Sequence, residues 1–83
     1  MNFDNAVEDV TMAIEQQLSC TMEGDEFVVD QHHLHFSNPL GYSIDDFGEI
    51  ASDYVAGNRA VGAVHAMPSE WKRGYVQVVI FMR

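Results

Sequence analysis

The first 58 residues of this chain contain no lysine and no arginine, although they hold twelve aspartates and glutamates. All basic residues fall in the last 25 positions, where there is a single acid. Residues 1–58 therefore carry −12 and residues 59–83 carry +3, which together give the net charge of −9. A fold does not require this segregation, since surfaces of mixed sign are equally soluble and repel themselves less. The asymmetry indicates a basic partner. The basic residues are Arg59, Lys72, Arg73 and Arg83.

Cysteine and long apolar runs are also scarce. Cys20 is alone, so the chain can form no internal disulfide, and a reducing cytoplasm fits best. The start of the chain lacks the cationic and apolar segments of a signal peptide. The longest apolar run, residues 78–82, is far shorter than the ~20 residues of a membrane span. We therefore expect a cytoplasmic protein that does not enter a membrane, and its 83 residues predict a single domain, 1–83.

Motifs that would name a reaction are missing. The sequence has no Gly-x-Ser-x-Gly element and no glycine-rich phosphate loop, and Cys20 has no activating base close by in the sequence. Its many carboxylates look exposed, an environment that does not tune them for acid catalysis. We therefore expect neither an enzyme nor a cofactor.

Two segments have the periodicity of amphipathic helices. Residues 3–19 place apolar side chains every three or four positions, on one side of a helix. A second helix is expected from Ser43 to about residue 56, because Ser43-x-x-Asp46 resembles a capping box with Asp in place of Glu. Gly57-Asn58 supplies its stop.

The other segments predict strands. Residues 20–25 read as a turn-rich connection, and residues 26–36 are rich in strand formers. Within the latter, Phe27 and Leu34 have opposite parity, so one straight strand cannot bury both. A hairpin through Asp30-Gln31 solves this by placing Phe27 opposite Leu34; a bulge would also do so, and the hairpin is preferred.

A second hairpin is expected from residues 59–67 and 75–83, around a turn at 68–74. The last strand is apolar on nearly both faces, which is typical of a central strand. The predicted fold is a single small α+β domain of order α-β-β-α-β-β, with a mostly antiparallel sheet and both helices on one face.

The second helix carries its acids on one arc of roughly 100° opposite its apolar face. Glu49 forms i,i+4 like-charge pairs with Asp45 and Asp53, each costing a few tenths of a kcal/mol. Asp45 and Asp46 complement the dipole at the helix start, whereas Asp53 lies where the dipole disfavours it. A solvated polar face is the ordinary interpretation of one such helix.

Acids also follow the first helix as Asp4, Glu8 and Glu15. The chain therefore has two acid-striped helices, and it lacks Lys and Arg over 58 residues. Together these features make a functional interpretation as good as that of a solvated polar face. That interpretation is a surface that fits a positively charged groove built for nucleic acid.

The histidines permit a weaker hypothesis. His33 and His35 share a strand face by period two and could hold Zn²⁺, Cu²⁺ or Ni²⁺, with His65 and Glu26 as further ligands. No further Cys or His completes a closed site, so ordinary surface histidines are the preferred interpretation.

Trp71 lies at the tip of the second hairpin, beside Lys72 and Arg73. Two roles fit this Trp side chain equally well. It can be a binding hot spot, or it can fold back onto the sheet or stack on Arg. The basic end has no aromatic platform of recognised pattern, so we do not expect direct binding of nucleic acid.

The leading hypothesis is a non-catalytic protein inhibitor that binds a basic, nucleic-acid-binding surface of a target protein. In size, acidity and lack of motifs the chain is similar to phage-encoded inhibitors of bacterial defence, such as anti-CRISPR proteins and DNA mimics, and to small immunity proteins. One alternative is a self-assembling subunit that pairs through opposite charges or through a C-terminal strand at a sheet edge. The other is the histidine-based metal module. The expected partner-binding residues are Asp45, Asp46, Glu49, Asp53, Asp4, Glu8, Glu15 and Trp71.

Overall fold

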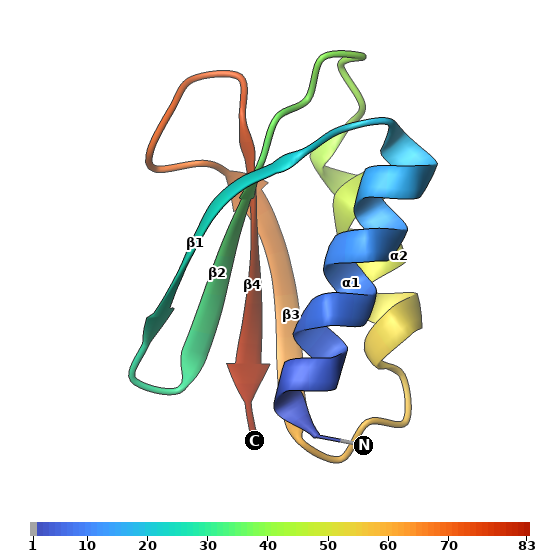
Figure 1. Cartoon of the computed structure of the whole chain (residues 1–83), viewed down its shortest axis with the longest axis vertical. Helices are drawn as coiled ribbons and strands as arrows, with labels where there is room; N and C mark the ends of the chain where they lie inside the picture. The colour runs from blue at the N-terminus through green and yellow to red at the C-terminus, as the bar shows by residue number, and fades with distance from the viewer. Residues whose placement is uncertain (1) are drawn as a thin grey trace.

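The computed structural model describes residues 2–83, which fold in the order α-β-β-α-β-β (Figure 1). This is the α+β architecture and the element order that the sequence predicted. The elements are α1 (Phe3–Leu18), β1 (Met22–Val28), β2 (Gln31–Phe36), α2 (Ile44–Val55), β3 (Val61–Pro68) and β4 (Val76–Met82). Neither helix of the described chain is long and apolar enough to cross a membrane.

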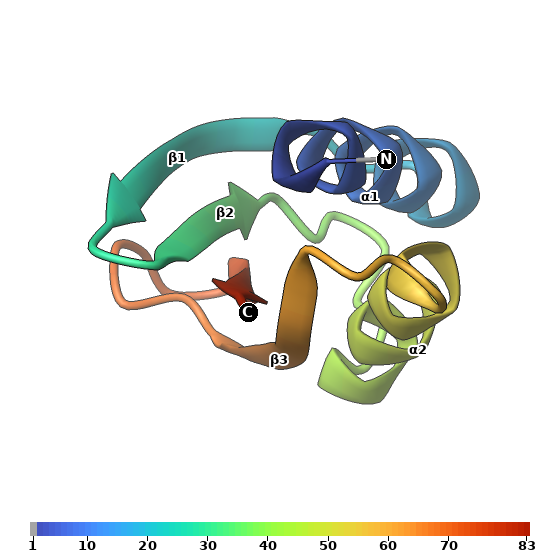
Figure 2. The same ribbon diagram turned by 90° about the horizontal axis from the view of Figure 1, so that it is seen from below.

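The four strands form one antiparallel sheet in the order β1-β2-β4-β3, and both helices cover the same face of it (Figures 1 and 2). β4 lies between β2 and β3, which confirms the central position predicted from its two apolar faces. Pairing of two copies through a C-terminal edge strand is therefore wrong, because β1 and β3 are the edges of this sheet.

The core lies between the helices and the middle of the sheet. Ile14 of α1, Phe47 of α2, Leu34 of β2 and Ile80 of β4 have no exposed surface and belong to one buried cluster. The rings of Phe47 and Phe36 lie 6.0 Å apart within it. Burial of each such side chain stabilises the fold by about 1.5–3 kcal/mol. The apolar faces predicted for both helices are therefore the faces that dock on the sheet.

β1 and β2 form the predicted hairpin, but its register differs from the prediction. Phe27 pairs with His32 and Asp25 pairs with Leu34, so the placement of Phe27 opposite Leu34 was wrong. Because the shift is of two residues, every side chain keeps its predicted face. Phe27 then packs edge-on against Phe3 of α1, with ring centroids 6.0 Å apart.

β1 also begins earlier than expected. Residues 20–25 were predicted to be a turn-rich connection, whereas the strand starts at Met22, which pairs with Phe36. The ladder continues past a bulge between Met22 and Gly24, and the Ser37 N–H donates to the Thr21 carbonyl at 2.9 Å. Pairing with β2 thus overrides the local turn preference of the Glu-Gly-Asp sequence.

Candidate protein-binding groove

α2 starts and ends where its local sequence predicts. The Ser43 Oγ accepts a hydrogen bond from the Asp46 N–H at 3.2 Å, and the Asp46 carboxylate accepts one from the Ser43 N–H at 3.1 Å. This is the predicted capping box. Beyond the last turn, Gly57 adopts a φ of 81°, a left-handed conformation that suits glycine. Asp46 is therefore half-buried and engaged in the cap, unlike the other acids of α2.

A groove runs between α2 and β3. Its larger part is a hollow of about 610 Å³ lined by Asp45, Glu49 and Asp53 from the helix and by Val64 and Ala66 from the strand. The three carboxylates are exposed and lie along one side of the same hollow. The structure thus brings together three of the four acids that were predicted on this helix.

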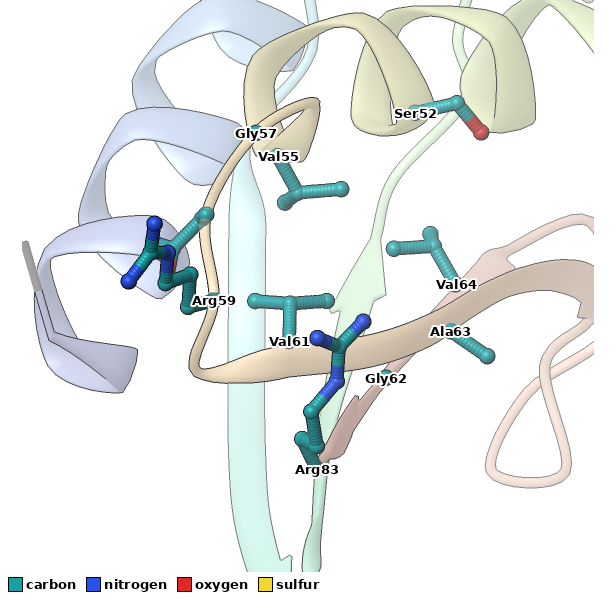
Figure 3. A pocket seen from close by; sticks show the side chains of 10 residues that line it. Ser52, Val55, Gly57, Arg59, Val61, Gly62, Ala63, Val64 and Arg83 are labelled. Atoms are coloured by element: carbon teal, nitrogen blue, oxygen red, sulfur yellow. The ribbon is translucent and has the colours of Figure 1, made fainter.

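The groove continues into a second hollow of about 320 Å³, which shares Ser52 and Val64 with the first (Figure 3). Arg59 and Arg83 line this second part, and Arg83 extends to it from the end of β4. The two adjoining hollows therefore place acids along α2 and arginines at the end where β3 begins.

The acids of α1 do not join this groove. The Gln17 amide donates to the Tyr54 hydroxyl at 3.5 Å, so Tyr54 lies on the side of α2 that faces α1. At 100° per residue, Asp45 and Glu49 lie about 180° and 140° around α2 from Tyr54. The groove therefore opens away from α1, and the two acid sets do not form one surface.

Among the α1 acids, Asp4 and Glu8 are exposed, whereas Glu15 has a structural contact. Its carboxylate accepts a hydrogen bond from the Met22 N–H at 2.9 Å, which ties the start of β1 to the helix. Glu15 is thus less available to a partner than the sequence alone indicates.

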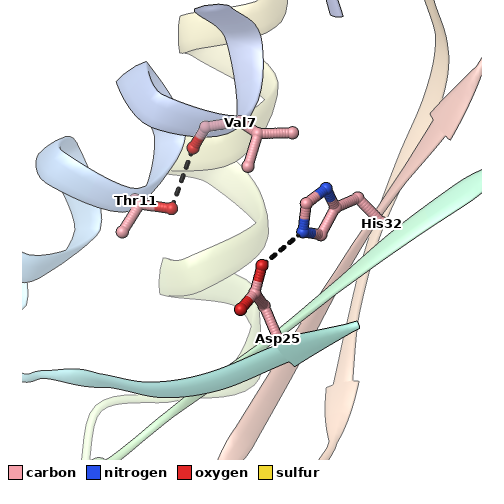
Figure 4. A network of polar contacts seen from close by, with 4 residues as sticks. All are labelled: Val7, Thr11, Asp25 and His32. Atoms are coloured by element: carbon pink, nitrogen blue, oxygen red, sulfur yellow. Dashed lines mark hydrogen bonds and ion pairs between the residues drawn. The ribbon is translucent and has the colours of Figure 1, made fainter. Parts of the chain in front are cut away.

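Among the described residues, a single pair of acidic and basic side chains lies within ion-pair distance, and it is ionic only when its histidine is protonated. Asp25 and His32 approach to 2.6 Å across the β1–β2 hairpin (Figure 4). The same view shows the Thr11 hydroxyl of α1, which donates to the Val7 carbonyl at 2.8 Å. No Lys or Arg therefore neutralises a carboxylate in residues 2–83. The acids along the groove remain uncompensated within the chain.

Trp71 lies on the opposite face of the sheet from the helices, where it covers β2. Its ring stacks on the imidazole of His35 at a centroid distance of 3.7 Å and an interplanar angle of 11°. About half of Trp71 remains exposed. The Trp has folded back onto the sheet, and its stacking partner is a histidine rather than an arginine.

Beneath Trp71, His35 is fully buried in a polar network. Its Nδ1 lies 2.8 Å from the Ser69 Oγ, which also accepts a hydrogen bond from the Trp71 N–H at 3.1 Å. Its Nε2 is buried without a partner among the residues described. Burial lowers the pKa of His35 below its ordinary value of 6.5, although the nearby carboxylates of Glu26 and Glu70 act in the opposite direction.

Two of the other proposed metal ligands, His33 and His65, have contacts within the protein. The His33 ring nitrogens lie 2.9 Å from the Gln31 Oε1 and 3.2 Å from the Gln77 Nε2, and the His65 ring packs edge-on against Phe81. Within the part of the chain that the structure covers, no three His, Cys, Asp or Glu side chains are placed to hold a metal ion.

Cys20 is buried at the end of α1, where its thiol contacts the Ile14 carbonyl at 3.7 Å. Burial, together with the nearby Glu15 carboxylate, raises the pKa of the Cys20 thiol to about 11. The thiol is therefore protonated at neutral pH, which is the unreactive form of the group.

Comparison of the chain with protein-family models, with curated proteins and with solved structures finds no match. What the protein does must therefore be inferred from its own groove and charges.

Two features of this groove, its strand side and its basic end, were not predicted from the sequence. Val64 and Ala66 have no distinctive pattern, and Arg59 and Arg83 lie far apart in the chain. Pro68 at the end of β3 was one signal that this strand lies at the edge of the sheet, since proline within sheets is confined to edge strands, strand ends and bulges.

Proposed function

We propose that this protein is a non-catalytic inhibitor that binds a basic surface of a partner protein, a surface that otherwise holds nucleic acid. The observation that carries the proposal is the alignment of Asp45, Glu49 and Asp53 along one groove. Nucleic-acid-binding proteins and complexes of bacterial defence are partners of this kind, and inhibitors encoded by phages act on them. We place this action in the cytoplasm, where the Cys20 thiol stays reduced.

The charges of α2 support binding more than stability. Glu49 has like-charged neighbours four residues away on both sides, and Asp53 lies near the negative end of the helix dipole. A lysine at either position would stabilise the isolated protein. A basic partner relieves this repulsion, so the free energy lost in the free protein is recovered on association. Steering by the net charge of −9 makes association fast and sensitive to salt.

The test is a pair of charge-reversed variants with the same spacing on different helices. Glu49→Lys/Asp53→Lys alters the groove, and Asp4→Lys/Glu8→Lys makes the same change of charge at exposed positions of α1. Each protein is used to capture partners from a nuclease-treated lysate of the source cells. The captured protein is then identified, and displacement of its nucleic acid is measured at low and high salt.

We expect the groove variant to lose about 100-fold in affinity and the α1 variant to lose far less. Wild-type protein should displace nucleic acid from the captured partner, and the groove variant should not. Equal binding by the groove variant and wild type would show that these acids are an ordinary solvated face.

Self-association is a second candidate, favoured by the acidic and basic parts of the groove, which complement each other between two copies of the chain. Its signature is an oligomer of the pure protein that dissociates when salt is raised, measured by sedimentation. A monomer at all salt concentrations would eliminate pairing through opposite charges.

A further inference from the structure

The outer edge of β3 lies along the groove and offers free backbone groups there. The Ser69 N–H donates to the Tyr75 carbonyl at 2.9 Å, in register with the β3–β4 ladder. Because hydrogen-bonded and non-bonded pairs alternate in an antiparallel ladder, His65 and Met67 bond to β4. Val64 and Ala66 lie in the alternate pairs, so their N–H and C=O groups point outward from the sheet.

Val64 and Ala66 are also the residues that line the strand side of the acidic hollow, together with His65. The residues that carry the free backbone groups and the three acids therefore line the same hollow. A row of unpaired N–H and C=O groups of this kind is a template for an added strand. The groove between α2 and β3 thus has the elements of a site for an extended peptide.

The spacing of the acids matches such a peptide. Asp45, Glu49 and Asp53 are four residues apart, which places them ~6 Å apart along α2. Alternate side chains of an extended strand are ~6.6 Å apart and point to one face. A segment paired with β3 would therefore present every second side chain to one acid of α2.

Charge also sets the chemistry of the segment and, for an antiparallel strand, the order of its residues. The acids line the groove toward the end of β3 that carries Ala66, and Arg59 and Arg83 lie at the end where β3 begins. An antiparallel segment places its earlier residues beside the acids and its later residues beside the arginines. Lys or Arg at alternate positions, followed by a neutral or acidic end, complements this groove.

We propose that the groove binds an extended segment of the partner protein by adding it as an antiparallel strand to the free edge of β3. Alternate Lys or Arg side chains of the segment pair with Asp45, Glu49 and Asp53. This inference rests on the proposed function, because it specifies how the basic partner engages the same acids.

The experiment uses the purified protein and an end-blocked peptide of sequence Lys-Thr-Lys-Val-Lys-Thr. Amide hydrogen exchange is followed by NMR, and binding is followed by the shifts of the same amides. In the complex, exchange at Val64 and Ala66 should slow by about tenfold or more. Exchange at His65 and Met67, which already bond to β4, should be unchanged.

Two N-methylated peptides form a matched control for strand pairing. Methylation of the N–H groups that face β3 should abolish the protection, and methylation of the alternate N–H groups should leave it intact. On the protein side, Ala66→Pro removes an outward N–H of an edge strand, a position where proline is tolerated, and should abolish binding.

Other outcomes separate the two proposals. Binding that ignores both N-methylation patterns and leaves Val64 and Ala66 exchanging fast would overturn strand pairing, while the acidic surface would still account for the partner. Failure of the groove reversal to weaken partner binding would overturn the proposed function itself. Protection that rises with protein concentration without peptide would show that a second copy occupies the edge, and no peptide binding at all would also overturn the inference.

Discussion

Trp71 stacks on His35 with the two rings 3.7 Å apart and 11° from parallel, so that a loop between β3 and β4 covers part of the face of the sheet that the helices leave open. The buried neighbours on this face include Gln77, whose side-chain oxygen accepts a hydrogen bond from the Glu70 N–H at 3.1 Å. The loop thus acts as a second, small layer over β2 and β4.

Removal of this stack should destabilise the protein. Trp71→Ala is expected to lower the free energy of unfolding by about 1–2 kcal/mol, since a stacked aromatic pair and its apolar burial are lost. Chemical denaturation followed by circular dichroism measures the change, because the variant has no other tryptophan to report it.

Gly24→Ala is the matched test of where the indole lies. A Cβ at this position would stand 2.3 Å from the Trp71 Cζ3, so the ring must move away even though it is still present. We expect the native-state fluorescence of Trp71 to shift to the red as the ring becomes more hydrated. An unchanged emission spectrum would show that the indole does not lie over Gly24.

The stability of the protein should fall as the pH is lowered, partly because of His35. Its folded-state pKa is lower than the unfolded value near 6.5, so the unfolded chain binds this proton more readily. The contribution of neutral His35 to the free energy of unfolding is therefore fully present above pH 6.5. It is lost as the pH falls through the folded-state pKa. The physical reason is that burial disfavours the charged, protonated ring, whose Nε2–H would have no acceptor.

Melting temperatures of wild type and His35→Gln between pH 7.5 and 5 measure this effect. The difference in stability between the two proteins should shrink as the pH falls, because only wild type has the buried imidazole to protonate. A constant difference across the range would assign the acid sensitivity to other groups, of which His33, Glu26 and Glu70 lie nearest to His35.

The turn between β1 and β2 holds a strained residue. Val29 has a φ of 59° and is 87% exposed, so a β-branched side chain adopts the left-handed conformation with little burial in return. Val29→Gly should therefore stabilise the protein by about 1 kcal/mol in thermal unfolding. Val28→Gly, one residue earlier within the strand, should have the opposite sign, since glycine weakens a strand. Loss of stability in both variants would contradict the strained turn.

Gly48 lies within α2, where glycine costs about 1 kcal/mol relative to alanine. An added Cβ would stand 3.5 Å from the Ala66 Cβ, which is an ordinary contact. Gly48→Ala should therefore raise the free energy of unfolding by up to about 1 kcal/mol. Destabilisation by alanine would show that α2 and β3 approach more closely than this distance.

The elements themselves were predictable from the sequence. The Ser43–Asp46 cap and the Gly57 stop depend on contacts within one helical turn, and the apolar stripes of both helices depend on spacing alone. The central position of β4 followed from its two apolar faces, because a strand buries both faces only in the middle of a sheet, where other parts of the chain cover each face.

The hairpin register was not predictable from the same rules. Parity decides which face Phe27 occupies, but two registers that differ by two residues satisfy it equally. The packing of Phe27 on Phe3 and the Asp25–His32 pair distinguish between these registers, and both contacts require the tertiary structure.

The sequence by itself determined the composition of the candidate site: three like-charged residues at helical spacing and a long stretch without Lys or Arg. Only the tertiary structure decided which acids face a groove, that Asp46 and Glu15 have structural contacts instead, and that Trp71 covers His35. The physical reason is that charge and periodicity are local properties of the chain. Which strand edge lies beside which helix depends instead on how distant apolar faces bury one another.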